Sequence, residues 1–151
     1  MEEEPGPLPG FERDEGLRDI TVPGTTLEDW RRFLRFARDS YPIEFLVELV
    51  PREMPDDPAT IFQLGQHDPV LLRIFVGGVQ LNSYFFTTTE IDLDLDPTEV
   101  ETPADASRVL RFLKELGDAL NRTVLMTYDG APDLVVYRYD PHTPEPVYLT
   151  R

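Results

Sequence analysis

The chain has 151 residues, about the length of one domain, and its 40% hydrophobic and 28% charged residues are typical of a globular protein. The formal net charge of -15 makes nucleic acid and anionic membrane poor partners, because both would repel the chain. The sequence has no cysteine, which excludes disulfides and thiolate chemistry, and no apolar run reaches the roughly 20 residues of a membrane span. We expect a soluble, cytoplasmic protein without a cofactor, monomeric or weakly self-associating.

The first sixteen residues differ in composition from the rest of the chain. They are rich in Pro, Gly and Glu and contain six acidic residues against one arginine, a net charge of -5. Such a segment buries too little apolar surface to offset the entropy of ordering it. We therefore predict a disordered acidic tail at 1–16 and a single domain at 17–151.

A short strand is expected at 17–22, followed by a helix. Thr25 and Glu28 have the spacing of a capping box, in which a hydroxyl and a carboxylate each satisfy a free backbone N–H at a helix start. Apolar residues recur from there at helical intervals, and Pro42 ends the pattern. The sequence thus predicts a first helix that ends just before Pro42.

Strand patterns follow the first helix. Residues 43–50 alternate acidic and apolar side chains, and 59–64 is a weaker strand candidate. Two β-rich runs, 70–76 and 79–86, are joined by Gly77 and Gly78, which favour a tight hairpin turn. The acidic segment from residue 90 is expected to be the next strand of an antiparallel meander.

A second helix is predicted from Thr102, the expected cap, through Pro103 to Asn121. The segments 123–128 and 133–139 flank a turn and predict a second hairpin, and 146–150 can add a short strand. Strands come in blocks and do not alternate singly with helices, which favours an α+β fold. We expect one antiparallel sheet of five to seven strands, a meander plus a hairpin, with two helices packed on one face.

The most distinctive stretch is "EIDLDLDP", which places Glu90, Asp92, Asp94 and Asp96 at every second position. On a strand, these carboxylates leave from one face and the aliphatic residues between them pack behind. Residues 90–105 contain seven acids and no base. The excess negative charge of the chain is thus concentrated here and in the tail.

Three interpretations of this acidic row can be weighed. An EF-hand is rejected, because counting from Asp92 the required Gly and Glu positions hold Pro97 and Pro103. A row of charge can also be a solvated sheet face, or protect an edge strand from pairing with other chains. The third interpretation is a docking surface for a basic protein, with these partner-binding residues: Glu90, Asp92, Asp94, Asp96, Glu99 and Glu101.

The first helix carries the opposite charge. Arg31, Arg35 and Arg38 share one stripe with Arg32 beside it, which suggests an anion-binding or self-association surface. Acidic residues at helical spacing can instead neutralise the row within the same helix. Both interpretations remain open at the level of the sequence.

Little in the sequence indicates catalysis. The three serines do not lie in a nucleophile elbow, and "VGGVQ" lacks the features of a phosphate-binding loop. We therefore predict a non-enzymatic acidic domain that binds a basic protein, with an immunity or antitoxin-type inhibitor as one form of it. The alternative is a small-molecule- or metal-binding protein, or an enzyme with a pocket between sheet and helices that uses His67 or His142 beside a carboxylate.

Overall fold

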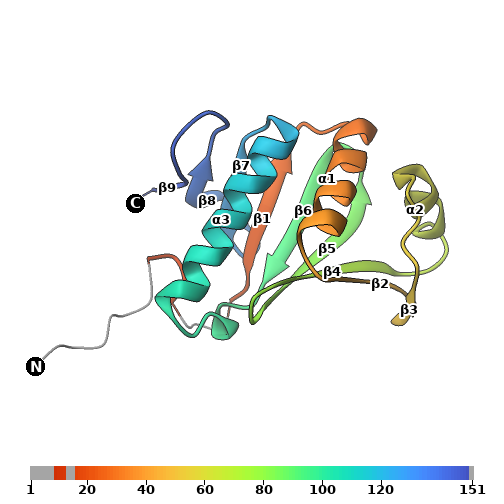
Figure 1. The fold of residues 1–151 in the computed structure, drawn as a ribbon, viewed down its shortest axis with the longest axis horizontal. Helices are drawn as coiled ribbons and strands as arrows, with labels where there is room; N and C mark the ends of the chain where they lie inside the picture. Colours follow the sequence, from red (N-terminus) through yellow and green to blue (C-terminus); the bar gives the residue numbers. More distant parts are fainter. Residues whose placement is uncertain (1–8, 13–15, 150–151) are drawn as a thin grey trace, which may run out of the picture.

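The structure is a computed structural model that describes residues 9–12 and 16–149, and Figure 1 presents its fold. Most of the expected tail, residues 1–8 and 13–15, lies outside the described residues. The helices are α1 (Leu27–Ser40), α2 (Pro58–Leu64) and α3 (Pro103–Leu120), with a short 3-10 helix η1 (Pro97–Glu99). The strands are β1 (Arg18–Pro23), β2 (Ile43–Val47), β3 (Val50–Arg52), β4 (Val70–Val76), β5 (Val79–Thr87), β6 (Glu90–Leu95), β7 (Val124–Tyr128), β8 (Ala131–Tyr139) and β9 (Val147–Tyr148).

All strands belong to one antiparallel sheet. Among the described residues the strand order is β3-β2-β4-β5-β6-β1-β7-β8-β9, so the N-terminal strand lies in the middle of the sheet. The predicted α+β class and single antiparallel sheet are confirmed. In the described part of the chain the sheet has nine strands, where five to seven were expected, and the fold has three α-helices, where two were expected.

The helices α1 and α3 lie side by side across one face of the sheet (Figure 1). The helix α2 lies beyond α1, toward the edge of the sheet formed by β2 and β3. The core between these layers is made by alternate residues of the strands, such as Ile91, Leu93 and Leu95 of β6, and by the buried stripes of the helices. Trp30 of α1 is fully buried at its centre. No helix covers the other face in the part of the chain described, which leaves it as the open face of the sheet.

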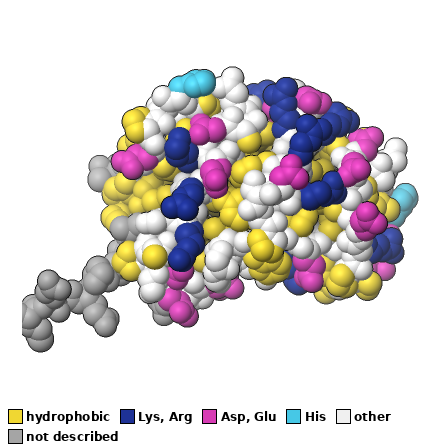
Figure 2. Space-filling view, viewed as in Figure 1, with side chains coloured by type: hydrophobic (Ala, Val, Ile, Leu, Met, Phe, Trp, Pro, Cys, Tyr) yellow, Lys and Arg dark blue, Asp and Glu magenta, His cyan; other side chains and the backbone are white. Residues whose placement is uncertain are grey.

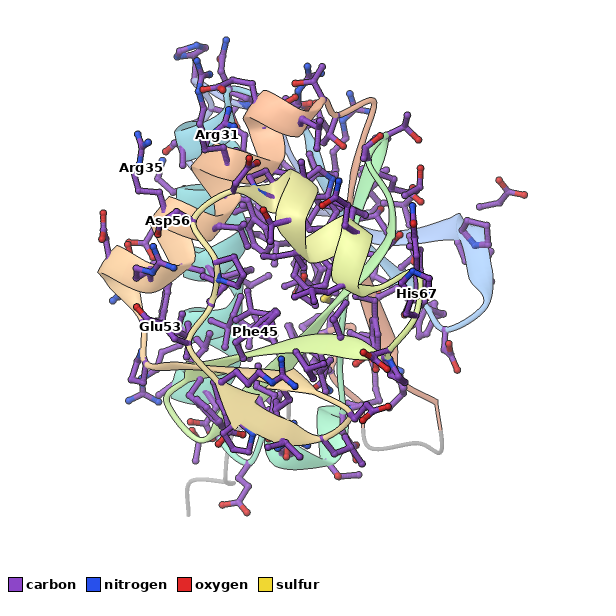
Figure 3. All side chains as sticks on the ribbon, turned by 90° about the vertical axis from the view of Figure 1, so that its right-hand side faces the viewer. Arg31, Arg35, Phe45, Glu53, Asp56 and His67 are labelled. Atoms are coloured by element: carbon purple, nitrogen blue, oxygen red, sulfur yellow. The ribbon has the colours of Figure 1, made fainter. Side chains whose placement is uncertain are left out.

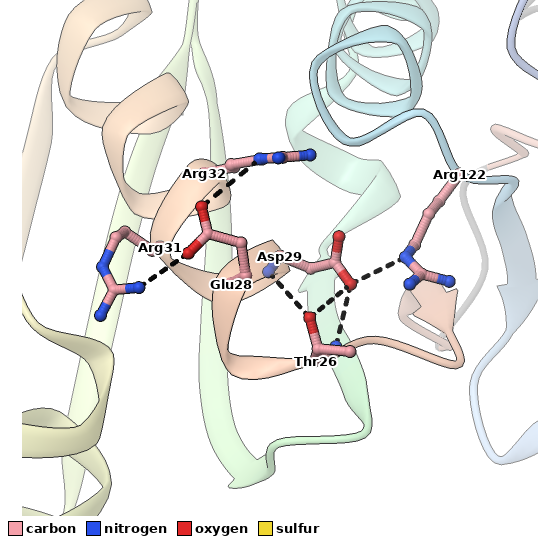
Figure 4. A network of polar contacts seen from close by, with 6 residues as sticks. All are labelled: Thr26, Glu28, Asp29, Arg31, Arg32 and Arg122. Carbon is pink, nitrogen blue, oxygen red and sulfur yellow. Dashed lines mark hydrogen bonds and ion pairs between the residues drawn. The ribbon is translucent and has the colours of Figure 1, made fainter.

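The start of α1 is one residue later than expected. The cap is Thr26, whose hydroxyl accepts from the Asp29 backbone N–H, while the Asp29 carboxylate accepts from the Thr26 N–H at 2.9 Å (Figure 4). The expected pair, Thr25 and Glu28, does not form the capping box. The Thr25 hydroxyl donates to the Thr88 carbonyl oxygen, and Glu28 faces solvent. At α3 the predicted cap Thr102, first residue Pro103 and end at Asn121 are confirmed.

The strand predicted at 59–64 is wrong, because this segment forms α2. Asp57 caps the helix by accepting from the Ala59 N–H at 3.0 Å, and Pro58 occupies the first turn. The buried Ile61 and the partly buried Phe62 pack toward α1 and the sheet. Two turns are too short for hydrophobic periodicity to separate a helix from a strand.

The strand predicted at 43–50 is shorter and is followed by a turn. Glu48 and Leu49 have φ of 52° and 63°, which reverses the chain into the edge strand β3. Both angles lie in the left-handed region that glycine and asparagine adopt most readily. The sequence carries no such residue here, so the hairpin had no recognisable signature.

Part of the N-terminal segment packs on the sheet. Phe11 is fully buried against Tyr137 of β8, with ring centroids 5.9 Å apart. Arg18 of β1, also fully buried, donates from Nε to the Gly10 carbonyl at 2.7 Å and from Nη2 to the Glu12 carbonyl at 3.1 Å. This guanidinium therefore holds residues 10–12 against the domain.

Candidate functional site

The acidic row lies on the open face of the sheet. Ile91, Leu93 and Leu95 are buried under the helices, while Glu90, Asp92 and Asp94 project to the opposite side and are partly exposed. The predicted extended conformation is confirmed. The interpretation as an edge strand is wrong, because β6 pairs with β5 on one side and β1 on the other.

The register of these strands extends the row. Asp92 lies between Tyr84 of β5 and Thr21 of β1, and Asp94 lies between Asn82 of β5 and Asp19 of β1. Asp19 therefore joins the acidic row, although the two segments are far apart in the sequence. We call Asp19, Glu90, Asp92 and Asp94 the acidic face.

The remaining predicted partner-binding residues have separate local contacts. The Asp96 carboxylate accepts from the Thr98 N–H at 2.9 Å and so caps η1. Glu99 accepts from the Gln80 N–H at 2.9 Å, and Glu101 is exposed just before α3. These three residues follow β6 and do not continue its row.

Burial, with added charge repulsion, raises the pKa of two carboxyl groups of the acidic face, Asp92 and Asp19. Burial is the largest cause that brings the pKa of Asp92 to about 6, followed by the charge of Glu90 and a hydrogen bond between the two carboxyl groups. Burial also raises the pKa of Asp19, to which Asp129 and Asp94 add repulsion. Burial and Asp94 raise the pKa of Tyr84 to about 12, so the phenol is protonated at neutral pH. The negative charge of the acidic face is therefore not fully neutralised by neighbouring groups.

A change of Asp92 to Asn is expected to stabilise the folded state at neutral pH. The folded-state pKa of Asp92, about 6, is above its ordinary 3.8, so the folded protein binds more protons between these values than the unfolded chain. Stability is therefore full below about pH 4 and falls as the pH rises through about 6. We expect Asp92→Asn to remove this decline and to raise the free energy of unfolding at pH 7 by roughly 1 kcal/mol after solvent screening.

Urea unfolding of both proteins from pH 4 to 7 measures this difference. Asp133→Asn is the control, because Asp133 is exposed on β8 and not part of the acidic face. A difference between Asp92→Asn and the parent protein that stays constant across this range would contradict the assignment.

The acidic face does not have the arrangement of a metal site. Across residues 9–12 and 16–149, no group of three or more acidic or histidine side chains is placed to hold a metal ion. Asp94 instead accepts from the Asn82 side-chain amide at 3.1 Å. What this arrangement can do chemically is attract and hold cationic groups.

The arginines of α1 are largely neutralised. Glu28 contacts both Arg31 and Arg32, and Arg122 joins Asp29 at 2.8 Å (Figure 4). Arg38 forms an ion pair with Asp56 in the loop before α2. Figure 3 shows Arg31, Arg35 and Asp56 on one side of the molecule, where they line a shallow groove.

Arg35 alone of the four arginines has no ion pair among the residues that the structure describes. On the helical side, basic side chains gather over α1 and in a column over α3 (Figure 2). Acidic side chains are interspersed with them, so this side has mixed charge. The helical side therefore differs from the acidic face, where four carboxylates lie together on two adjacent strands.

The two histidines lie apart. His67 follows α2 and is exposed, whereas His142 lies beyond β8 beside a groove of about 480 Å³ that Lys114, Asp118 and Tyr139 also line. Lys114 Nζ donates to Asp118 at 3.1 Å, and the Tyr139 hydroxyl also donates to Asp118. Partial desolvation acts to raise the pKa of Asp118, but the hydrogen bonds from Tyr139 and Lys114 outweigh it and lower this pKa, while burial raises the pKa of Tyr139. These groups are therefore held in their ordinary protonation states at neutral pH.

The described helices include none that is both long and apolar enough to cross a membrane. The predicted absence of a spanning helix agrees with this finding. Comparisons with known protein families, with curated proteins and with solved structures find no match to this chain.

Proposed function

We propose that this chain is a non-enzymatic binding domain whose acidic face docks a basic protein. An immunity or antitoxin-type inhibitor is one form of such a protein, because a toxin that handles nucleic acid needs a cationic surface for phosphates. An acidic partner can occupy that surface with complementary charge and a high association rate.

The observation that carries the proposal is the acidic face itself. Its four carboxylates lie on two adjacent strands, and among the described residues the two arginines that share the open face are already paired. Arg73 joins Glu44 at 3.0 Å, and Arg138 joins Asp140 at 2.9 Å. Burial is the largest cause of the raised pKa of Asp92, and a cationic partner would relieve the repulsion from Glu90 that adds to it.

The test begins with capture of a basic protein from the source cells and measurement of its affinity for the isolated chain. Asp19→Asn, Asp92→Asn and Asp94→Asn are introduced together, which removes three charges from the acidic face. We expect the dissociation constant to rise by about tenfold or more, and the dependence of affinity on salt to become less steep.

A charge-matched control separates a specific face from overall charge. Asp39→Asn, Asp133→Asn and Glu145→Gln change the net charge equally at exposed positions away from the acidic face. We expect this control to bind nearly as tightly as the parent protein. Equal weakening by both triple variants, or binding that does not depend on salt, would refute docking through this face.

A further inference from the structure

The open face continues into an apolar groove next to the acidic face. The groove has a volume of about 350 Å³, and its lining includes Leu49, Pro69, Val70, Leu71, Tyr84 and Phe86. Tyr84 connects the two surfaces, because it lines the groove and lies opposite Asp92 on the neighbouring strand. The acidic face and the groove are therefore continuous.

Large apolar side chains are unusually exposed at this groove. Phe86 is 74% exposed and Leu49 is 72% exposed. Phe86 stacks on Tyr84 with ring centroids 5.2 Å apart and an interplanar angle of 5°, which presents a flat aromatic wall. Leu49 is also held at φ 63°, a conformation that non-glycine residues rarely adopt. An exposed leucine in this unfavourable conformation does not contribute to the stability of the isolated domain.

Carboxylates flank the groove on two sides. On one side lie Glu48, next to Leu49, and Asp68, next to Pro69, and the Glu48 N–H donates to the Pro69 carbonyl at 2.9 Å. On the other side lie Asp92, opposite Tyr84, and Glu90, opposite Thr87. A segment bound in the groove would thus have negative charge on both sides of it.

We infer that the groove receives one large apolar side chain of the basic partner, with arginine or lysine residues on both sides of it in the partner's sequence. This inference rests on the proposed function and adds the chemistry of the docking segment. Adjacent strands are about 4.8 Å apart, so a short extended segment that crosses β5 and β6 reaches the groove and Asp92 together. Interface energy is generally concentrated where such an apolar anchor fills a pocket.

The experiment uses the full chain and three labelled peptides in fluorescence polarisation. The first peptide has a central leucine with two arginines on each side, the second has glycine in place of the leucine, and the third has glutamates in place of the arginines. We expect the leucine peptide to bind about tenfold more tightly than the glycine peptide, and the glutamate peptide not to bind.

Two variants assign the preference to the groove. Leu49→Gly removes the apolar side chain and suits the left-handed turn, so its thermal stability should not fall. Phe86→Ala removes the exposed ring. Each should abolish most of the preference for leucine and leave binding of the glycine peptide unchanged. Val147→Ala, at an exposed position in the distant strand β9, should change neither.

The possible failures are distinguishable. Equal binding of the leucine and glycine peptides, both weakened by the triple variant of the acidic face, would overturn the groove assignment and leave the proposed function in place. Binding of none of the peptides, with a captured protein indifferent to the acidic face, would overturn both. A concentration-dependent dimer that Leu49→Gly dissociates would assign the groove to a second copy of the chain and also overturn the inference.

Discussion

Trp30→Ala is expected to lower the free energy of unfolding by about 3–5 kcal/mol. Trp30 lies where α1, α2 and the sheet meet, with ring centroids 5.1 Å from Phe62 of α2 and 5.2 Å from Phe85 of β5. Its indole Nε1 also donates to the Thr88 carbonyl at 3.2 Å. Truncation to Ala opens a cavity and leaves that carbonyl without its indole donor.

Urea unfolding followed by circular dichroism measures this loss, because Trp30 is the one tryptophan of the chain and its fluorescence disappears in the variant. Phe86→Ala is the matched control, an aromatic residue removed from an exposed position. We expect the control to change stability by no more than about 0.5 kcal/mol. Similar losses in the two variants would mean that Trp30 is not the centre of the core.

Arg18→Met is expected to cost about 3–5 kcal/mol, because it leaves several backbone carbonyls without their donor while keeping a side chain of similar length. The Arg18 guanidinium donates to the carbonyls of Gly10, Glu12 and Gly16, and its Cζ lies 4.6 Å from the centroid of the Tyr128 ring. Methionine cannot donate to these carbonyls, so the segment at 10–12 would lose its attachment to β1.

The measurement combines urea unfolding with amide hydrogen exchange at residues 10–12. Arg35→Met is the control, because Arg35 is an exposed arginine of α1 without an ion pair in the described part of the chain. Arg18→Lys should restore little, since an ammonium group cannot reproduce the planar set of donors. A loss below about 1 kcal/mol in Arg18→Met would show that the buried guanidinium is dispensable.

The sequence predicted α3 well and missed α2, and the reason is length. Eighteen residues with a Thr102 cap and a long apolar stripe carry several independent helix signals. The seven-residue helix α2 is signalled only by its cap Asp57 and its first residue Pro58, a pair that also occurs in loops. The turn at Glu48 and Leu49 was missed because no residue there favours positive φ.

The candidate site was predicted in its local geometry and not in its surroundings. Alternation alone placed Glu90, Asp92 and Asp94 on one face, because side-chain direction in a strand has a period of two. Strand order and register arise from contacts between distant segments, so the sequence pattern could not place β6 in the sheet interior or set Asp19 beside Asp94. The groove depends on such contacts as well, since its walls come from three separate segments.

The central place of β1 has a consequence for how the protein reaches its native state. Ile20 pairs with Leu93 on one side and with Met126 on the other, so both neighbours of β1 are made long after it during synthesis. The ribosome must release most of the chain before the two halves of the sheet can join through this strand. Folding is slow in such a topology, because closing long loops costs conformational entropy before the native contacts that offset this cost have formed. We therefore expect this topology to produce a late, cooperative assembly step, in which β1 pairs with β6 and β7 only after both have been synthesised.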